Sequence, residues 1–369
     1  MKKVLILTTS TGQGHNQAAN SLIEALTDAG FECVKHDFLA SDNKFINKIV
    51  VWSYEFFAAK IPHIYGFFYK LTDNKYINNL SSIFFSSVRW KISKFIENEK
   101  PDLIIGTHPF TVNIITKLKV KGMSIPFIAV VTDFKAHYTY ISPLVDAYVT
   151  GSKNTKDFLI SVGIKPEIIY PIGIPIKESF FEKDINIPSI KDDEYFSLLL
   201  MSGSMGLTSI SYVLDELLKN EHKLRITVVC GNNENLRKSL LKKCENGYPN
   251  KKIHIFGFSN DIASFMEYSD IIISKPGGLT VTEAIIKNLP LIIPFVIPGQ
   301  EKDNADFLAS NGYAYYVHDI KSINSIVDKI IENPELLSEM KKNLKDLSST
   351  YSSKAIIDIS NNLINTNGK

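Results

Sequence analysis

Four histidine and aspartate side chains in the first half of the chain follow short apolar runs that are typical of buried strands. His15 follows the first run, His108 follows a second, and Asp133 and His137 follow a third. The carboxyl ends of parallel strands meet at one edge of a sheet, so we expect these side chains to share a crevice. An imidazole that titrates near neutral could take a proton from an attacking hydroxyl, which makes His15 or Asp133 the candidate base. The alternative for each residue is a local structural role, such as a cap on the following helix.

A strand, a glycine turn and a helix start follow one another in the second half. Residues 270–274 form an apolar β-branched run, Lys275-Pro276-Gly277-Gly278 interrupts it, and residues 279–286 have apolar side chains at helical spacing. Glycines let a ligand approach the backbone, and the first turn of a helix presents unpaired N–H groups and the positive end of its dipole. This pattern predicts a seat for a diphosphate. A tight turn without a ligand is the alternative.

Glu283 and the polar cluster around Glu301 each allow two interpretations. Thr280 and Glu283 have the spacing of a capping box, in which the glutamate binds backbone at the helix start. The Glu283 carboxylate could also accept hydrogen bonds from both hydroxyls of a ribose. Further on, an apolar run at 291–294 precedes the polar cluster that contains Gln300, Glu301 and Asn304. This cluster is either a ligand-binding strand end or a solvated loop.

The order K-P-G-G-L-T-x-x-E-A, an apolar run and then P-G-Q-E resembles the sugar-nucleotide half of GT-B glycosyltransferases. The most similar branch contains monogalactosyldiacylglycerol synthases and bacterial processive diacylglycerol glucosyltransferases, and Gly12-Gln13-Gly14-His15 matches the first loop of the lipid enzymes. The resemblance implies that Gly14, His15, His108 and His137 lie on the acceptor side. It also implies that the UDP-sugar is bound by Ser202, Gly203, Ser204, Gly257, Phe258, Lys275, Pro276, Gly277, Gly278, Thr280, Glu283, Gln300, Glu301 and Asn304.

This resemblance implies an inverting hexosyltransferase that moves a hexose from UDP to diacylglycerol, once or repeatedly, with glucose favoured and galactose as the alternative sugar. An N-acetylglucosaminyltransferase with another lipid acceptor and a catalytically silent membrane sensor of the same fold are the alternatives. The chain has no Asp-x-Asp triplet, so we expect no bound metal and no cofactor, with helix N-termini carrying the leaving-group charge. A dehydrogenase is a weaker alternative, because Gly12-x-Gly14 lacks the third glycine of a dinucleotide fingerprint.

Composition and hydropathy limit the partners and the compartment. The chain has 369 residues, 44% hydrophobic residues and a formal net charge of +2, which does not favour nucleic acid. Three separated cysteines fit a reducing cytoplasm, and no apolar run is long enough to span a membrane. Residues 43–95 are rich in aromatic and basic side chains, which suit an anionic membrane surface, although a domain core would also use the rings. We therefore expect a cytoplasmic protein, peripheral on the inner face of the membrane, whose oligomeric state stays open.

The elements that position these residues alternate between strands and helices in both halves. This alternation predicts an α/β protein, and the resemblance specifies a GT-B fold with two facing Rossmann-like domains, parallel sheets and an interdomain cleft. We expect an acceptor domain at 1–172 and a UDP-sugar domain at 173–349, with a proline- and glycine-rich hinge at 171–176. The strand at 148–152 should be the last of the first sheet. A helical tail should start at Asn333-Pro334, and its last part, about 350–369, is expected to pack on the first domain.

Overall fold

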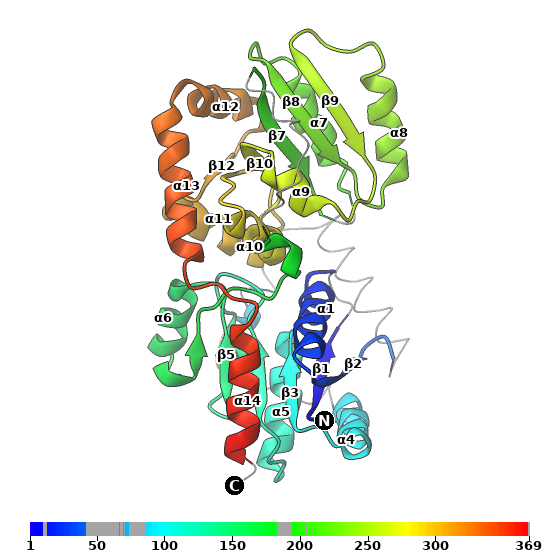
Figure 1. Cartoon of the computed structure of the whole chain (residues 1–369), viewed down its shortest axis with the longest axis vertical. Coiled ribbons are helices and arrows are strands. Elements are labelled where there is room, and N and C mark those ends of the chain that lie inside the picture. The colour runs from blue at the N-terminus through cyan, green and yellow to red at the C-terminus, as the bar shows by residue number, and fades with distance from the viewer. Residues whose placement is uncertain are drawn as a thin grey trace. The chain divides into compact units, whose positions relative to one another are not determined.

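The computed structural model describes residues 1–9, 13–41, 66, 69, 71–73, 86–182, 194–203 and 206–367. The chain forms two compact units, each built on a six-stranded parallel sheet (Figure 1). Unit 1 contains residues 1–178, 297–300 and 350–369, and unit 2 contains residues 179–296 and 301–349. The predicted α/β class with two parallel sheets is confirmed.

The sheet of unit 1 has the strand order β2-β1-β3-β4-β5-β6. Each interior strand is a short run of apolar residues that are buried on both faces, which is the pattern of a parallel sheet covered by helices on both sides. The order reverses between β1 and β3, so this is the point where loops diverge and leave room for a ligand. The strands are β1 (Lys3–Thr8), β2 (Glu32–Asp37), β3 (Leu103–Gly106), β4 (Phe127–Val130), β5 (Ala147–Val149) and β6 (Ile169–Tyr170).

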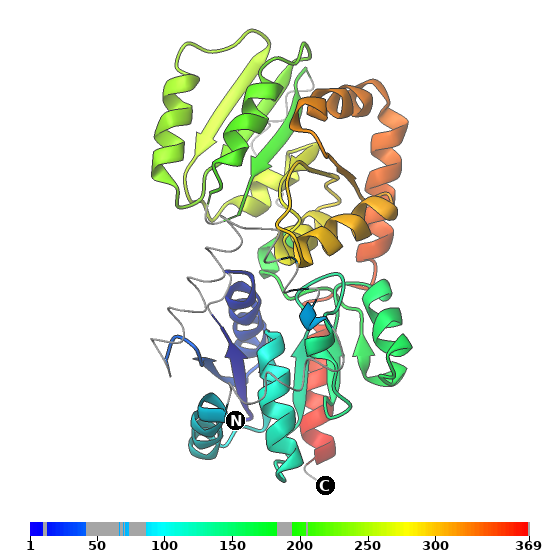
Figure 2. The ribbon, with the colours of Figure 1, turned by 180° about the vertical axis from the view of Figure 1, so that it is seen from behind.

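Helices cover both faces of this sheet. α1 (Gln13–Asp28) and the last helix, α14 (Ala355–Asn367), pack on one face through Leu22, Leu26, Ile356 and Ile359 (Figure 1). The opposite face is covered by α4 and α5, seen in cyan tones from behind in Figure 2. Further helical elements of unit 1 are α4 (Ser86–Glu99), α5 (Pro109–Val120), η2 (Tyr138–Tyr140), α6 (Lys153–Ser161) and η3 (Pro166–Ile168).

The sheet of unit 2 has the order β12-β11-β10-β7-β8-β9, which is the doubly wound order of a Rossmann fold. Its reversal lies between β7 and β10, so the loops that follow these two strands flank the expected ligand position. The strands are β7 (Phe196–Met201), β8 (Leu224–Val229), β9 (Lys251–Phe256), β10 (Ile271–Ile273), β11 (Leu291–Ile293) and β12 (Ala314–Tyr316).

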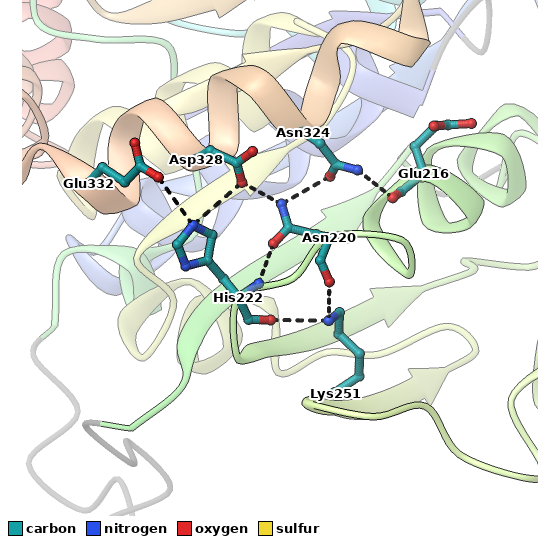
Figure 3. A network of polar contacts seen from close by, with 7 residues as sticks. All are labelled: Glu216, Asn220, His222, Lys251, Asn324, Asp328 and Glu332. Atoms are coloured by element: carbon teal, nitrogen blue, oxygen red, sulfur yellow. Dashed lines mark hydrogen bonds and ion pairs between the residues drawn. The ribbon is translucent and has the colours of Figure 1, made fainter.

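Helices and a polar network complete unit 2. Asn220, at the turn between α7 and β8, hydrogen-bonds to Asn324 and Asp328 of α12, as Figure 3 shows. These bonds attach α12 to the amino-terminal edge of the sheet, away from the loops that follow β7 and β10. The helices are α7 (Ser209–Leu217), α8 (Glu234–Lys243), α9 (Ile262–Glu267), α10 (Gly278–Ile286), α11 (Gln300–Ser310), α12 (Ile323–Glu332) and α13 (Pro334–Ser348), and η4 (Glu178–Phe180) and η5 (Ile320–Ser322) are short 3₁₀ turns.

Two element predictions are wrong in detail. β5 is not the last strand of the first sheet, because Ile169 and Tyr170 pair with it as β6. β6 has only two residues and follows a 3₁₀ turn, so its sequence has no hydrophobic pattern from which a strand could be predicted. The helical tail does start at Asn333-Pro334, where the Asn333 side chain accepts from the N–H of Leu336, but it ends at Ser348 and resumes as α14. Most of the predicted membrane segment, residues 43–85, lies outside the described residues apart from 66, 69 and 71–73.

Candidate active site

His15 and His108 meet where the strand order of unit 1 reverses. His15 lies in the first turn of α1, which follows β1, and His108 is the residue immediately before α5, which follows β3. Their ring centroids are 4.5 Å apart in an edge-to-face arrangement. Gly14, next to His15, lies in the same first turn and is half-buried. The structure therefore places Gly14, His15 and His108 at one edge of the sheet.

The hydrogen bonds of His15 define which of its ring nitrogens carries the proton. Nδ1 is 2.8 Å from the carbonyl oxygen of Thr107 and 3.1 Å from the hydroxyl oxygen of Thr132. A carbonyl can only accept, so Nδ1–H donates to Thr107 and the lone pair is on Nε2. Burial lowers the pKa of His15 from its ordinary 6.5 to about 4, although the bond to Thr107 raises it. The expectation of an imidazole that titrates near neutral is therefore wrong, because burial moves the titration of His15 well below pH 7.

His108 has the opposite tautomer. Its Nδ1 accepts from the backbone N–H of Phe110 at 3.1 Å, which caps α5, so the proton of the neutral ring is on Nε2. Burial, with a smaller contribution from His15, lowers the pKa of His108 well below its usual value. At this edge one ring thus presents a proton acceptor and the other a donor.

Asp133 and His137 both follow β4, the neighbour of β3. Asp133 is half-buried beside Thr132, and its charge contributes to the raised pKa of the Tyr140 phenol, after burial. His137 caps η2 by accepting from the N–H of Thr139 at 3.2 Å. Its Nε2 lies 3.2 Å from the carbonyl oxygen of Tyr69. His137 therefore ties the end of β4 to residues 69–73.

In unit 2 the glycine turn stands at the start of α10 without a side-chain cap. Gly277 is the extended N-cap residue and Gly278 is the first residue of the helix. Thr280 is thus inside the first turn, so the capping-box interpretation of Thr280 and Glu283 is wrong. The amides of the first turn have no carbonyl within their own helix to bond, and the N-cap glycine leaves access to them. Such a helix start is suited to an anion.

Lys275 lies between the two glycine loops of unit 2. A Cβ added at Gly277 would lie 3.6 Å from Lys275 Nζ, and one added at Gly203, which has φ +76°, would lie 3.4 Å from Lys275 Cε. The Lys275 ammonium also donates to Glu301 Oε1 at 2.5 Å. The Glu301 side chain is only 8% exposed, so this pair is largely removed from water. The cation beside the helix start is therefore held in place by a carboxylate of α11.

The remaining predicted donor residues surround this turn or lie on the neighbouring loops. Asn304 is fully buried and donates from Nδ2 to the carbonyl oxygen of Pro276 at 3.0 Å, which holds the turn against α11. Ser202, directly after β7, accepts from the N–H of Leu207 at 2.7 Å. Gly257 and Phe258 follow β9, with Phe258 57% exposed, and Gln300 is the first residue of α11. Ser204 lies outside the described residues.

The described residues contain no cluster of three metal-ligating side chains. None of the helices that the structure describes is long and apolar enough to cross a membrane.

The chain is similar to known proteins over most of its length. Residues 15–176 match the family model for monogalactosyldiacylglycerol synthase, and residues 197–357 match the glycosyltransferase family 28 C-terminal domain. Processive diacylglycerol beta-glucosyltransferases from Bacillus subtilis and Bacillus licheniformis are 31% and 32% identical, over 97% and 96% of this chain and 94% of each relative. The crystal structure of MurG from Acinetobacter baumannii has a TM-score of 0.67 at 16% identity and covers 98% of this chain and 100% of its own.

Two Rossmann-like units with parallel sheets form a GT-B fold, and the family 28 match and the Bacillus relatives make the chain a glycosyltransferase of this fold. The chain belongs to the family of the processive diacylglycerol beta-glucosyltransferases. The dehydrogenase alternative is overturned by these matches.

Sequence reasoning missed the residues that hold the candidate base. Thr107 and Thr132 contact His15 from positions 92 and 117 residues away in the chain. Threonine is common at strand ends, so neither position stands out in the sequence. The usable signal is their position, since Thr107 immediately precedes the candidate His108 and Thr132 immediately precedes the candidate Asp133.

Proposed function

We propose that this protein transfers a hexose, glucose rather than galactose, from a UDP-sugar to the hydroxyl of diacylglycerol, making a β-linked glycolipid. The observation that carries the proposal is the uncapped start of α10 with the Lys275 ammonium beside it. The names of the Bacillus relatives support diacylglycerol as acceptor, glucose as the sugar and repeated transfer as the outcome.

On the donor side, the diphosphate of UDP binds at Gly277 and Gly278, where first-turn amides and Lys275 face its charge. These fixed donors stabilise the negative charge that develops on UDP as it leaves, with no metal in this role. Glu283 accepts from the ribose hydroxyls, and the backbone at Gly257 and Phe258 meets the uracil. Gln300 faces the hexose, whereas Glu301 acts through its ion pair with Lys275.

On the acceptor side, the diacylglycerol oxygen attacks the anomeric carbon from the face opposite UDP. The new carbon–oxygen bond forms as the bond to the phosphate oxygen breaks, and Nε2 of His15 receives the hydroxyl proton. An imidazole with a pKa of about 4 is fully unprotonated at pH 7 but is a weak base. It therefore takes the proton as the attack proceeds rather than before it. Asp133, which follows Thr132, is the second candidate for this role.

Membrane contact is proposed through residues 43–95, on the inner face of the cell membrane. The described part of this segment includes α4, on which Trp90 is 64% exposed and stands beside Arg89 and Lys91. An exposed indole next to basic side chains suits the headgroup region of an anionic bilayer. The protein is then peripheral and takes its lipid acceptor from the membrane surface.

The test is incubation of the protein with vesicles of diacylglycerol and anionic phospholipid and with labelled UDP-glucose, UDP-galactose or UDP-N-acetylglucosamine, followed by separation of the lipids. We expect labelled monoglucosyl lipid first and longer glycolipids later. Label only from UDP-N-acetylglucosamine would favour the N-acetylglucosaminyltransferase alternative. UDP binding without any labelled lipid would indicate a silent sensor of the same fold.

A further inference from the structure

A short chain of buried hydroxyl groups stands behind His15, on the side away from Nε2. The Thr132 hydroxyl oxygen lies 3.1 Å from His15 Nδ1 and 3.2 Å from the Tyr140 hydroxyl. Thr132 is 4% exposed and Tyr140 is 2% exposed, so water does not compete for these contacts. His15 comes from α1, whereas Thr132 follows β4 and Tyr140 belongs to η2, and His15 is 117 residues from Thr132 in the sequence.

The Nδ1–H of His15 therefore has two oxygen acceptors. The first is the Thr107 carbonyl at 2.8 Å, and the second is the Thr132 hydroxyl. Thr107 also holds the backbone of the same residue, because its hydroxyl lies 3.1 Å from the His15 carbonyl oxygen. A hydrogen bond to the Thr107 carbonyl alone leaves the His15 ring free to turn about that hydrogen bond. A second acceptor from another strand end removes that freedom and sets the direction of Nε2.

We propose that Thr132 is a positioning residue for the transfer reaction, and that its hydroxyl, itself fixed by Tyr140, aims Nε2 of His15 at the acceptor hydroxyl. The inference rests on the proposed function and deepens it. Thr132 touches neither substrate, and its effect reaches the reaction through the orientation of one ring. When His15 takes the proton, the two oxygens at Nδ1–H also stabilise the imidazolium.

The kinetic test compares Thr132→Val, Thr132→Ser and Tyr140→Phe in the full-length protein. Valine keeps the shape of threonine and removes the hydroxyl, so we expect kcat to fall about tenfold, the size of one lost buried hydrogen bond. The KM for UDP-glucose should stay within about twofold, since the donor site is in unit 2. Serine keeps the hydroxyl and should restore most of kcat. Tyr140→Phe leaves Thr132 in place and should cause a smaller loss of kcat.

The matched control is Thr116→Val, a buried threonine of α5 whose hydroxyl bonds to the Val112 carbonyl oxygen at 2.7 Å. Thr116→Val should leave kcat within about twofold of the wild type. This control separates the general effect of losing a buried hydroxyl from the specific effect of losing the Thr132 hydroxyl. Wild-type kcat in Thr132→Val, or a loss in Thr132→Ser as large as in Thr132→Val, would overturn the proposal. If Thr132→Val does not fold, the contrast between Tyr140→Phe and Thr116→Val decides.

Nuclear magnetic resonance of the protein with ¹⁵N-labelled histidine gives a readout that needs no substrate. We expect the His15 proton on Nδ1 in the wild type, and a weaker hydrogen bond at that proton in Thr132→Val. A wild-type His15 protonated on Nε2 would refute the inference. If the wild type transfers no sugar at all, the proposed function fails, and this spectrum still decides whether the Thr132 hydroxyl holds the His15 ring.

Discussion

The Lys275 ammonium pairs with Glu301 and lies beside Gly277, and its Cε lies beside Gly203. A lysine in this position should contribute a charge-assisted hydrogen bond to a bound diphosphate, worth about 1.5–3 kcal/mol. We predict that Lys275→Met weakens UDP binding at least tenfold in calorimetric titration, because 1.4 kcal/mol corresponds to a factor of ten. Since Glu301 would be left buried without its cation, the double variant Lys275→Met with Glu301→Gln should regain folding stability but not affinity.

Lys302→Met is the control for this lysine. Lys302 lies one helical residue beyond Glu301, and its ammonium pairs with the exposed carboxylate of Asp306 at 2.7 Å. Lys302→Met removes one positive charge from α11, the helix that carries Glu301, and leaves the glycine turn unchanged. UDP affinity within about twofold of wild type is expected. Equal losses in Lys275→Met and Lys302→Met would show that only overall charge matters.

His108 should make the stability of unit 1 depend on pH. Its pKa is lowered on folding by burial and by His15, so between pH 6.5 and the lower folded value the unfolded chain binds more protons than the folded one. Stability must then fall as the pH falls through this window, by up to about 1.4 kcal/mol per pH unit for one histidine. His108→Asn removes the titration and keeps a side chain that can cap α5.

We therefore predict that His108→Asn is close to wild type in stability at pH 7.5 and loses less stability than wild type on acidification toward pH 5. The measurement is urea unfolding at several pH values, followed by tryptophan fluorescence. Both tryptophans, Trp52 and Trp90, belong to unit 1, so this signal follows that unit. Parallel stability curves for the two proteins would contradict the prediction.

At the scale of elements, the Asn220 network holds α12 to the sheet of unit 2. The Asn220 side chain donates to Asp328 Oδ1 at 2.6 Å and Asn324 Oδ1 at 3.3 Å, and accepts from the His222 N–H at 2.8 Å (Figure 3). Asn220 is 6% exposed, so losing its amide removes these three hydrogen bonds from a buried position. We predict that Asn220→Ala lowers the stability of unit 2 by about 2–3 kcal/mol.

Glu332→Gln is the control within the same network. Glu332 is 69% exposed and lies 3.7 Å from His222 Nε2, so its contribution should be within about 0.5 kcal/mol. Hydrogen exchange of peptides from α12 and β8 measures both variants, and faster exchange is expected only in Asn220→Ala. Unchanged protection of α12 in Asn220→Ala would show that the apolar contacts of the helix suffice. UDP binding should survive in both variants, because the network is at the edge opposite the glycine turns.

The sequence predicts elements well where an apolar run ends in a turn, and poorly where tertiary pairing creates the element. β10, the Gly277 turn and α10 follow from such a run, and so does β7. β6 could not be predicted, because two residues contain no period and only pairing with β5 makes them a strand. The capping box failed for a related reason. Its four-residue pattern is satisfied by Thr280 and Glu283, but α10 starts at Gly278 and places Thr280 inside the helix.

For the site residues, too, local patterns could be predicted from the sequence and tertiary contacts could not. His15 and His108 are predictable because each lies directly after a strand, and the parallel sheet brings these ends together. The pKa of His15 is not predictable, since burial by distant residues lowers it to about 4. The Lys275–Glu301 ion pair spans 26 residues, and no local pattern relates the two side chains.

At the scale of the molecule, the chain forms unit 1 from both of its ends. After α13 the chain returns to unit 1 at residue 350. There the Thr350 hydroxyl donates to the Pro171 carbonyl oxygen at 2.8 Å, and the Ser352 N–H donates to the Ile172 carbonyl oxygen at 3.0 Å. The Tyr351 ring packs on Gly173, whose φ is +92°, and its hydroxyl donates to the Gly151 carbonyl oxygen. The re-entering segment thus binds the stretch where the chain first leaves unit 1, and α14 follows it.

The last helix should therefore stabilise unit 1 rather than unit 2. Ile356 and Ile359 of α14 are 3% and 6% exposed and pack with Leu22, Ile105 and Ile128 in the core of unit 1. Each truncation of a buried isoleucine to alanine costs about 2–5 kcal/mol, so the double variant Ile356→Ala with Ile359→Ala should shift the tryptophan-detected urea transition strongly to lower urea. Asn362→Ala, on the exposed side of the same helix, should shift this transition little.

The UDP affinity of the double variant, measured at low temperature where the protein remains folded, should equal that of wild type, because the glycine turns and Lys275 belong to unit 2. A loss of UDP affinity together with an unmoved tryptophan transition would mean that α14 supports the donor site instead.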